Sequence, residues 1–103
     1  MGEWSTAAKK QNFGSKTCLC VEVSGHKIAL FDVEGTYYAI DDTCTHRGGP
    51  LSQGTVSSVT VTCPLHGAQF DVRSGKVLGP PAHEPVRSYK VVVEGDDIKI
   101  EIL

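Results

Sequence analysis

The chain of 103 residues lacks any apolar run as long as the roughly 18 residues that a membrane span needs, and it opens without a basic segment followed by an apolar one. We therefore expect a soluble protein of the cytoplasm, with no membrane partner. Basic residues are few: ten Lys and Arg against twelve Asp and Glu give a formal net charge of −2. Such a chain has no basic field for nucleic acid, which we exclude as a partner.

Helical periodicity is nearly absent, and only residues 5–10 could form a turn or two of helix. Turn signals such as Ser24-Gly25, Glu34-Gly35 and Glu94-Gly95 recur along the chain. The stretches between turns are rich in β-branched and aromatic residues. They predict strands at 17–23, 27–33, 36–40, 55–62, 69–72, 86–93 and 98–103. At this length we expect one all-β domain, residues 1–103.

The four cysteines occur in two settings. Cys18 and Cys20 flank Leu19 in an expected strand, too close for an unstrained disulfide with each other. Such alternate strand positions favour small core or half-buried residues over ligands or a redox pair. The other two cysteines each precede a histidine, as Cys44-Thr45-His46 and, after sixteen further residues, Cys63-Pro64-Leu65-His66.

Each of these pairs follows an expected strand, so each lies in a loop, and two loops on a rigid sheet can meet at one tip. Each loop offers one sulfur and one imidazole nitrogen. This set suits a binuclear cluster in which one iron takes both cysteines and the other takes both histidines. The same four residues could instead hold a structural zinc ion. Zinc modules usually keep like ligands close together, which favours the iron–sulfur interpretation.

The two pairs, with Gly48-Gly49-Pro50 beside the first and Gly67 beside the second, resemble the Rieske-type [2Fe-2S] ferredoxins over essentially the whole chain. The resemblance implies stacked antiparallel sheets with two cluster-binding loops at one tip, carried by residues 42–82 or so. It implies one [2Fe-2S] cluster per chain. Its site residues would be Cys44 and Cys63 on the inner iron and His46 and His66 on the outer one.

The resemblance also implies a third loop, Gly79-Pro80-Pro81, that shields the cluster from water. High-potential members add a disulfide between the cluster loops and two side-chain hydroxyls that donate to cluster sulfurs. The matching positions here are Gly49, Leu65, Ala68 and Phe70. Without these donors the reduced cluster is less stabilised, so we expect a potential toward the low end of the Rieske range, about −150 mV.

The resemblance implies a one-electron carrier rather than an enzyme, like the ferredoxin components of ring-hydroxylating dioxygenases. A flavin-containing reductase would supply the electron and a terminal oxygenase would accept it. An oxygenase needs a further iron held by two histidines and a carboxylate, but only His26 and His83 remain, far apart in the sequence. The alternative is a Rieske-like small subunit of an NADH-dependent nitrite reductase, bound to a large reductase subunit. We expect a monomer.

Three further residues have no assigned function. His26 follows a hairpin turn, where a solvated side chain without a role is the simplest interpretation. His83 follows the third loop; a solvated histidine is favoured over a contact with a partner or a proton path. Arg47 follows a ligand histidine, where it could dock an acidic surface or be ordinary surface charge.

Overall fold

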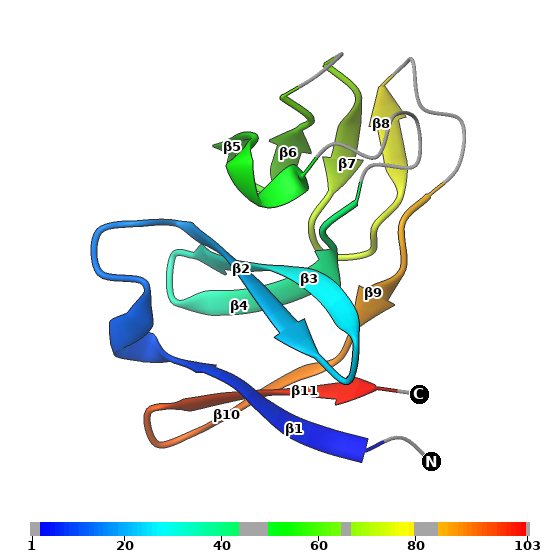
Figure 1. Cartoon of the computed structure of the whole chain (residues 1–103). Coiled ribbons are helices and arrows are strands. Elements are labelled where there is room, and N and C mark those ends of the chain that lie inside the picture. The colour runs from blue at the N-terminus through cyan, green and yellow to red at the C-terminus, as the bar shows by residue number, and fades with distance from the viewer. Residues whose placement is uncertain (1–2, 44–49, 65–66, 80–84, 103) are drawn as a thin grey trace.

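The computed structural model describes residues 3–43, 50–64, 67–79 and 85–102, and its regular elements are β-strands and two short 3-10 turns (Figure 1). The expected all-β fold is confirmed. The strands are β1 (Glu3–Lys9), β2 (Cys18–Val23), β3 (His26–Val33), β4 (Thr36–Asp41), β5 (Thr55–Ser57), β6 (Thr60–Thr62), β7 (Gln69–Asp71), β8 (Val77–Gly79), β9 (Ser88–Tyr89), β10 (Val91–Glu94) and β11 (Asp97–Ile102). The 3-10 turns are η1 (Lys10–Asn12) and η2 (Leu51–Gln53).

The strands form three antiparallel sheets, as the family resemblance implied. We call them the terminal sheet (β1-β11-β10), the central sheet (β2-β3-β4-β9) and the loop sheet (β5-β6-β7-β8). Figure 1 shows the loop sheet at one end of the molecule and the terminal sheet at the other. Glu3 pairs with Ile102, so both ends of the described chain lie far from the loop sheet. Within the described ranges, no helix has the length and apolar character to cross a bilayer.

Strand β3 links two separate cores. Its run Ile28–Phe31 is fully buried, because both faces of the central sheet are covered here. Successive strand side chains point to opposite faces. Ala29 and Phe31 therefore pack toward the loop sheet with Val61 and Phe70, whereas Ile28 and Leu30 pack toward the terminal sheet with Ile98 and Ile100. The continuous apolar run is what a strand covered on both faces requires.

Residues 5–10 do not form the helical turn that the local pattern allowed. Most of this stretch belongs to β1, which pairs with β11 and buries Ala8 beside Ile98 in the core; only Lys10 enters the 3-10 turn η1. Pairing with a distant strand overrides a weak local preference.

Two expected strands are each divided. The stretch 55–62 is a hairpin, β5 and β6, that turns at Ser58 with a φ of 55°. The stretch 86–93 is interrupted at Lys90: β9 pairs with β4 in the central sheet, and β10 pairs with β11 in the terminal sheet. The chain thus crosses between sheets without a turn signal. Strand β8, which pairs with β7, was not expected from the sequence.

The prediction for His26 is also wrong. This residue is not a solvated turn residue but begins β3, where it is half-buried. Its ring lies edge-on to that of Tyr89, with 6.4 Å between ring centroids. The contact joins residues 63 positions apart in the sequence, which no local pattern shows.

The turn between β7 and β8 is fixed by Gly75, whose N–H donates to the Asp71 carbonyl (2.7 Å) and whose carbonyl accepts from Val86 (2.9 Å). A Cβ at this position would collide with the Val86 carbonyl, and φ is +78°. We expect Gly75→Ala to lower the free energy of unfolding by about 2–4 kcal/mol, from the backbone strain and the collision together. Chemical denaturation followed by circular dichroism measures this loss in the free energy of unfolding.

Gly25 is the matched control for this variant. Its φ is +80°, nearly the same, but no atom lies within 4 Å of the position that a Cβ would occupy. Gly25→Ala should therefore lower the free energy of unfolding only by the cost of backbone strain, about 1 kcal/mol. Equal losses in both variants would mean that the close approach of Val86 contributes nothing.

Candidate metal centre

Of the four residues predicted to hold a metal, the structure describes Cys63. The others, Cys44, His46 and His66, lie outside the described residues, as do Arg47, Gly48, Gly49, Leu65, Pro80, Pro81 and His83. Cys63 directly follows β6 and is 3% exposed. It belongs to the core between the central and loop sheets, which also contains Leu51, Ala68 and Phe70.

Backbone hydrogen bonds join the residues before 65–66 to the residues after them. The Cys63 N–H donates to the Ala68 carbonyl (2.7 Å), and the Gly67 N–H donates to the Cys63 carbonyl (3.1 Å). Gly67 has a φ of 77°, a conformation that glycine adopts without strain. The Cys63 backbone is therefore held rigidly at the head of the β6–β7 hairpin.

The start of the second expected loop and the start of the third lie at one end of the loop sheet. Thr62 and Gly79 both pair with Gln69, so the exits of β6 and β8 lie at the same end of the loop sheet, on either side of β7. Thr43 forms an isolated bridge with Pro50, which closes the base of the segment 44–49. Leu51, next after Pro50, is fully buried in the core that contains Cys63. This arrangement fits the two-loop tip that the resemblance implied.

The surroundings of Cys63 fit a cluster ligand. A thiolate in an apolar core is unfavourable unless a metal takes up its charge, and thiolate sulfur is the ligand that iron–sulfur clusters require. The neighbouring Ala68 and Phe70 are fully buried and carry no hydroxyl, so neither side chain can donate to a sulfur atom. The site is therefore rigid, dry on its inner side and poor in side-chain donors.

Cys18 and Cys20 face the same side of β2, and Cys18 packs against the core that contains Cys63. Burial raises the pKa of Cys18 to about 12, and the charge of Asp42 adds to the effect. Burial, and then a hydrogen bond from its thiol to Asp42 Oδ2 (3.4 Å), raise the pKa of Cys20. Cys18 is half-buried as expected, whereas Cys20 is exposed, contrary to expectation. In the described part of the chain, no three metal-ligating side chains lie together.

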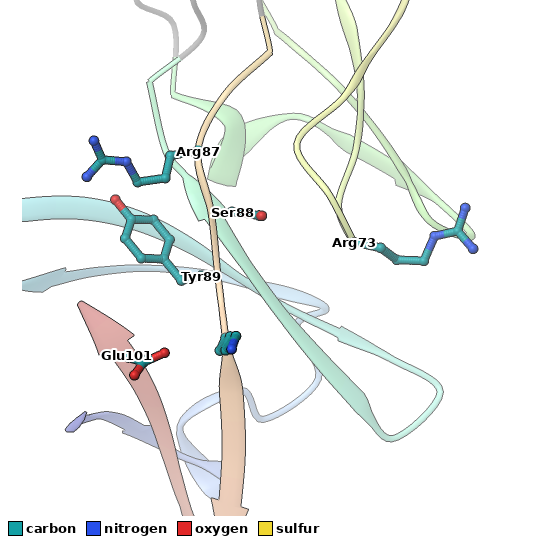
Figure 2. A pocket seen from close by; sticks show the side chains of 6 residues that line it. Arg73, Arg87, Ser88, Tyr89 and Glu101 are labelled. Carbon is teal, nitrogen blue, oxygen red and sulfur yellow. The ribbon is translucent and has the colours of Figure 1, made fainter. Parts of the chain in front are cut away.

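A hollow of about 580 Å³ is lined by Arg73, Arg87, Ser88, Tyr89, Lys90 and Glu101, and Cys63 does not line it. Figure 2 shows Arg73 and Arg87 on opposite sides of the strand that carries Ser88 and Tyr89, with their guanidinium groups pointing apart. Burial, and then the bond to Asp41, raise the pKa of Tyr89 to about 12. These cations do not converge on a common ligand, and the hollow is not the metal centre.

Sequence reasoning missed two residues at the base of the site, Asp41 and Asp42. Asp42 is 5% exposed and bonded to η2, while Asp41 is bonded to the segment that follows residues 80–84. Their only signal in the sequence is an acidic pair just before the first expected ligand. Nothing in that pattern shows which distant residues they hold.

The fold and this site define a class: a small all-β protein with a buried cysteine at the head of a hairpin in its loop sheet. The family model of the Rieske [2Fe-2S] domain matches residues 3–90. The chain belongs to the Rieske [2Fe-2S] domain family and holds one [2Fe-2S] cluster, so the zinc alternative is set aside.

The chain is 34% identical over 100 residues, 97% of its length and 96% of the relative's, to the ferredoxin component of the naphthalene 1,2-dioxygenase system of Pseudomonas aeruginosa. Among solved structures it is similar to the ferredoxin of carbazole 1,9a-dioxygenase from Nocardioides aromaticivorans IC177, with a TM-score of 0.89, 29% identity and coverage of 94% and 95% of the two chains.

It also matches a chain in the complex of reduced oxygenase and oxidized ferredoxin in carbazole 1,9a-dioxygenase, with a TM-score of 0.87, 28% identity and coverage of 95% and 92%. The expectation of an electron carrier, rather than a catalytic enzyme, is thereby confirmed: the protein is an electron-transfer component.

Proposed function

We propose that Cys44 and Cys63 bind the inner iron of the cluster through sulfur and that His46 and His66 bind the outer iron. The burial of Cys63 at the head of the β6–β7 hairpin carries this proposal. The shared core of Cys63 and Leu51, which follows the Thr43–Pro50 bridge, and the position of Gly79 at the same end of the loop sheet as Thr62 support it. When bound, the cluster supplies a site that takes up and releases one electron.

The residues around the proposed site have three different roles. Cys63, Ala68 and Phe70 exclude water from the inner side, because all three are buried in one core. The backbone bonds of Cys63 and Gly67 fix the loop geometry, so that little has to move when the charge of the site changes. His46 and His66 would provide the exit for the electron, since imidazole ligands would give a short covalent route from the iron to a docked partner.

As partners we propose a flavin-containing reductase that donates the electron and a terminal oxygenase that accepts it. Relatives over nearly the whole chain are ferredoxin components of dioxygenase systems, and one solved relative is in a complex with its oxygenase. Residues 1–103 would act as a single domain, with residues 42–82 or so carrying the cluster. The protein would be monomeric and cytoplasmic.

A transfer assay with the purified, cluster-loaded protein tests this role. We expect NADH and a dioxygenase reductase to reduce it, and the reduced protein to support single turnover of the matching oxygenase. Both rates should fall as salt screens the docking surfaces. The mixture without the protein is the control. Co-purification with a large flavin or sirohaem subunit, together with failure to reduce any oxygenase, would instead support the nitrite reductase alternative.

The reduction potential is expected at the low end of the Rieske range, about −150 mV, because Ala68 and Phe70 cannot donate to cluster sulfurs. Protein-film voltammetry measures it. Ala68→Ser should raise the potential by about 40 mV if its hydroxyl is worth about 1 kcal/mol more to the reduced than to the oxidised form. Ala29→Ser, in the same core but on β3, is the control. A wild-type midpoint well above zero contradicts the expectation.

A further inference from the structure

Asp42 ties together the two ends of the segment that contains the first pair of proposed ligands. It follows β4 and precedes Thr43, and its carbonyl accepts the Leu51 N–H (2.6 Å). Its carboxylate Oδ1 accepts the Ser52 N–H (2.7 Å), and its Oδ2 accepts the thiol of Cys20 (3.4 Å). One buried residue thus joins the start of the loop, its end and strand β2.

Asp41 makes a related connection to the chain that follows the segment 80–84. Its N–H donates to the Arg87 carbonyl (2.9 Å), and its Oδ2 accepts the Arg87 N–H (3.3 Å). Its Oδ1 accepts the hydroxyl of Tyr89 (2.5 Å). Because successive residues at a strand end point to opposite sides, the two neighbouring carboxylates can hold two different loops.

We propose that Asp41 and Asp42 form a clasp that sets the positions of the first and third loops relative to Cys63, and so act as positioning residues for the cluster. The inference rests on the proposed ligation by Cys44 and His46. Neither carboxylate is a ligand. The backbone amides of Ser52 and Arg87 lie just beyond the two loops, so the bonds act at the loop bases and not at the cluster.

The energetics favour Asp42 as the stronger half of the clasp. Its carboxylate is nearly fully buried, and a hydrogen bond to a charged group is about twice as strong as a neutral one. Loss of the carboxylate leaves the Ser52 amide without this acceptor. The base of the first loop then loses its side-chain bond to the central sheet and keeps only the backbone bond from Leu51, while Cys63, held by its own hairpin, stays in place. The distance between the two halves of the ligand set becomes variable.

The test compares variants of the cluster-loaded protein. Asp42→Ala is expected to release iron to a chelator about tenfold faster and to broaden or shift the electron paramagnetic resonance g values of the reduced cluster. Asp42→Asn keeps an oxygen for the Ser52 amide and should restore g values close to wild type. Asp32→Ala is the matched control, because this carboxylate also accepts a backbone N–H, from Gly35 (3.0 Å), but in the distant β3–β4 turn.

Tyr89→Phe tests the second half and keeps the proposal testable if Asp42→Ala does not fold. It removes only the hydroxyl that donates to Asp41. We expect iron release about threefold faster than in the wild type, with the fold intact by circular dichroism. The clasp would be overturned if Asp42→Ala and Tyr89→Phe both showed wild-type rates of iron release and wild-type g values. If Asp42→Ala does not fold, wild-type behaviour of Tyr89→Phe alone would overturn it. The proposed ligation fails on a different result, normal assembly of the cluster in Cys44→Ser or His46→Ala.

Discussion

His66→Cys is expected to keep a two-iron centre but to lower its reduction potential by about 100 mV or more. Replacing a neutral imidazole by a thiolate adds negative charge to the outer iron and disfavours the incoming electron. The magnitude follows from two reduction potentials: about −150 mV for the lowest centres with two histidine ligands and about −400 mV for plant-type centres with four cysteine ligands. Replacing one of the two histidines should therefore produce a substantial part of this difference. Voltammetry gives the shift, and the g values of the reduced protein should change with it.

The controls for His66→Cys come from the other histidines. His46→Cys should behave in the same way, because both imidazoles are proposed on one iron. His26→Ala, which removes a ring packed against Tyr89 in the central sheet, should leave the potential unchanged. An unaltered midpoint in His66→Cys would contradict the proposed ligation.

Cys63→Ser is expected to abolish the cluster. The hydroxyl is nearly the size of the thiol but is a far weaker ligand for iron, and here it would lie in an apolar core beside Leu51 and Phe70. The purified variant should be colourless, with iron and acid-labile sulfide below about one tenth of the wild-type content. Because the core loses both a ligand and an apolar contact, we also expect a loss of stability of about 2 kcal/mol or more.

Cys18→Ser and Cys20→Ser separate the ligand effect from the general effect of losing a thiol. Both residues lie on β2, and neither is assigned to the cluster. They should keep the full iron content, although Cys20→Ser alters the bond to Asp42. A coloured Cys63→Ser protein with two irons per chain would remove Cys63 from the ligand set.

The sequence was most informative where the structure is locally determined. The hairpins at Ser24-Gly25 and Glu34-Gly35 were predicted correctly, because left-handed turn residues and β-branched flanks are local signals. The helical turn at 5–10 was wrong, and the stretch 86–93 was wrongly predicted as continuous, because distant partners decide both: β11 for the first, and β4 and β11 for the second. No window of sequence contains those partners.

The site shows the same division. Cys63 and its neighbours Gly67 and Ala68 were proposed for the site from spacing and resemblance, since ligand chemistry restricts the residue types. The clasp could not, because Asp42 reaches Cys20, 22 residues earlier, and Ser52, ten residues later. Acidic pairs are common in sequences, and only the fold shows which amides their carboxylates accept.

The shared strand β3 has a consequence for how readily the protein exchanges an electron. Since Ala29 and Phe31 serve one core and Ile28 and Leu30 the other, neither outer sheet can shift without unpacking a face of the same strand. A framework locked in this way cannot relax much around a new charge. With the cluster at the proposed site, the reorganisation energy would fall mainly on the surrounding solvent, and a docking partner that displaces this water would speed the transfer.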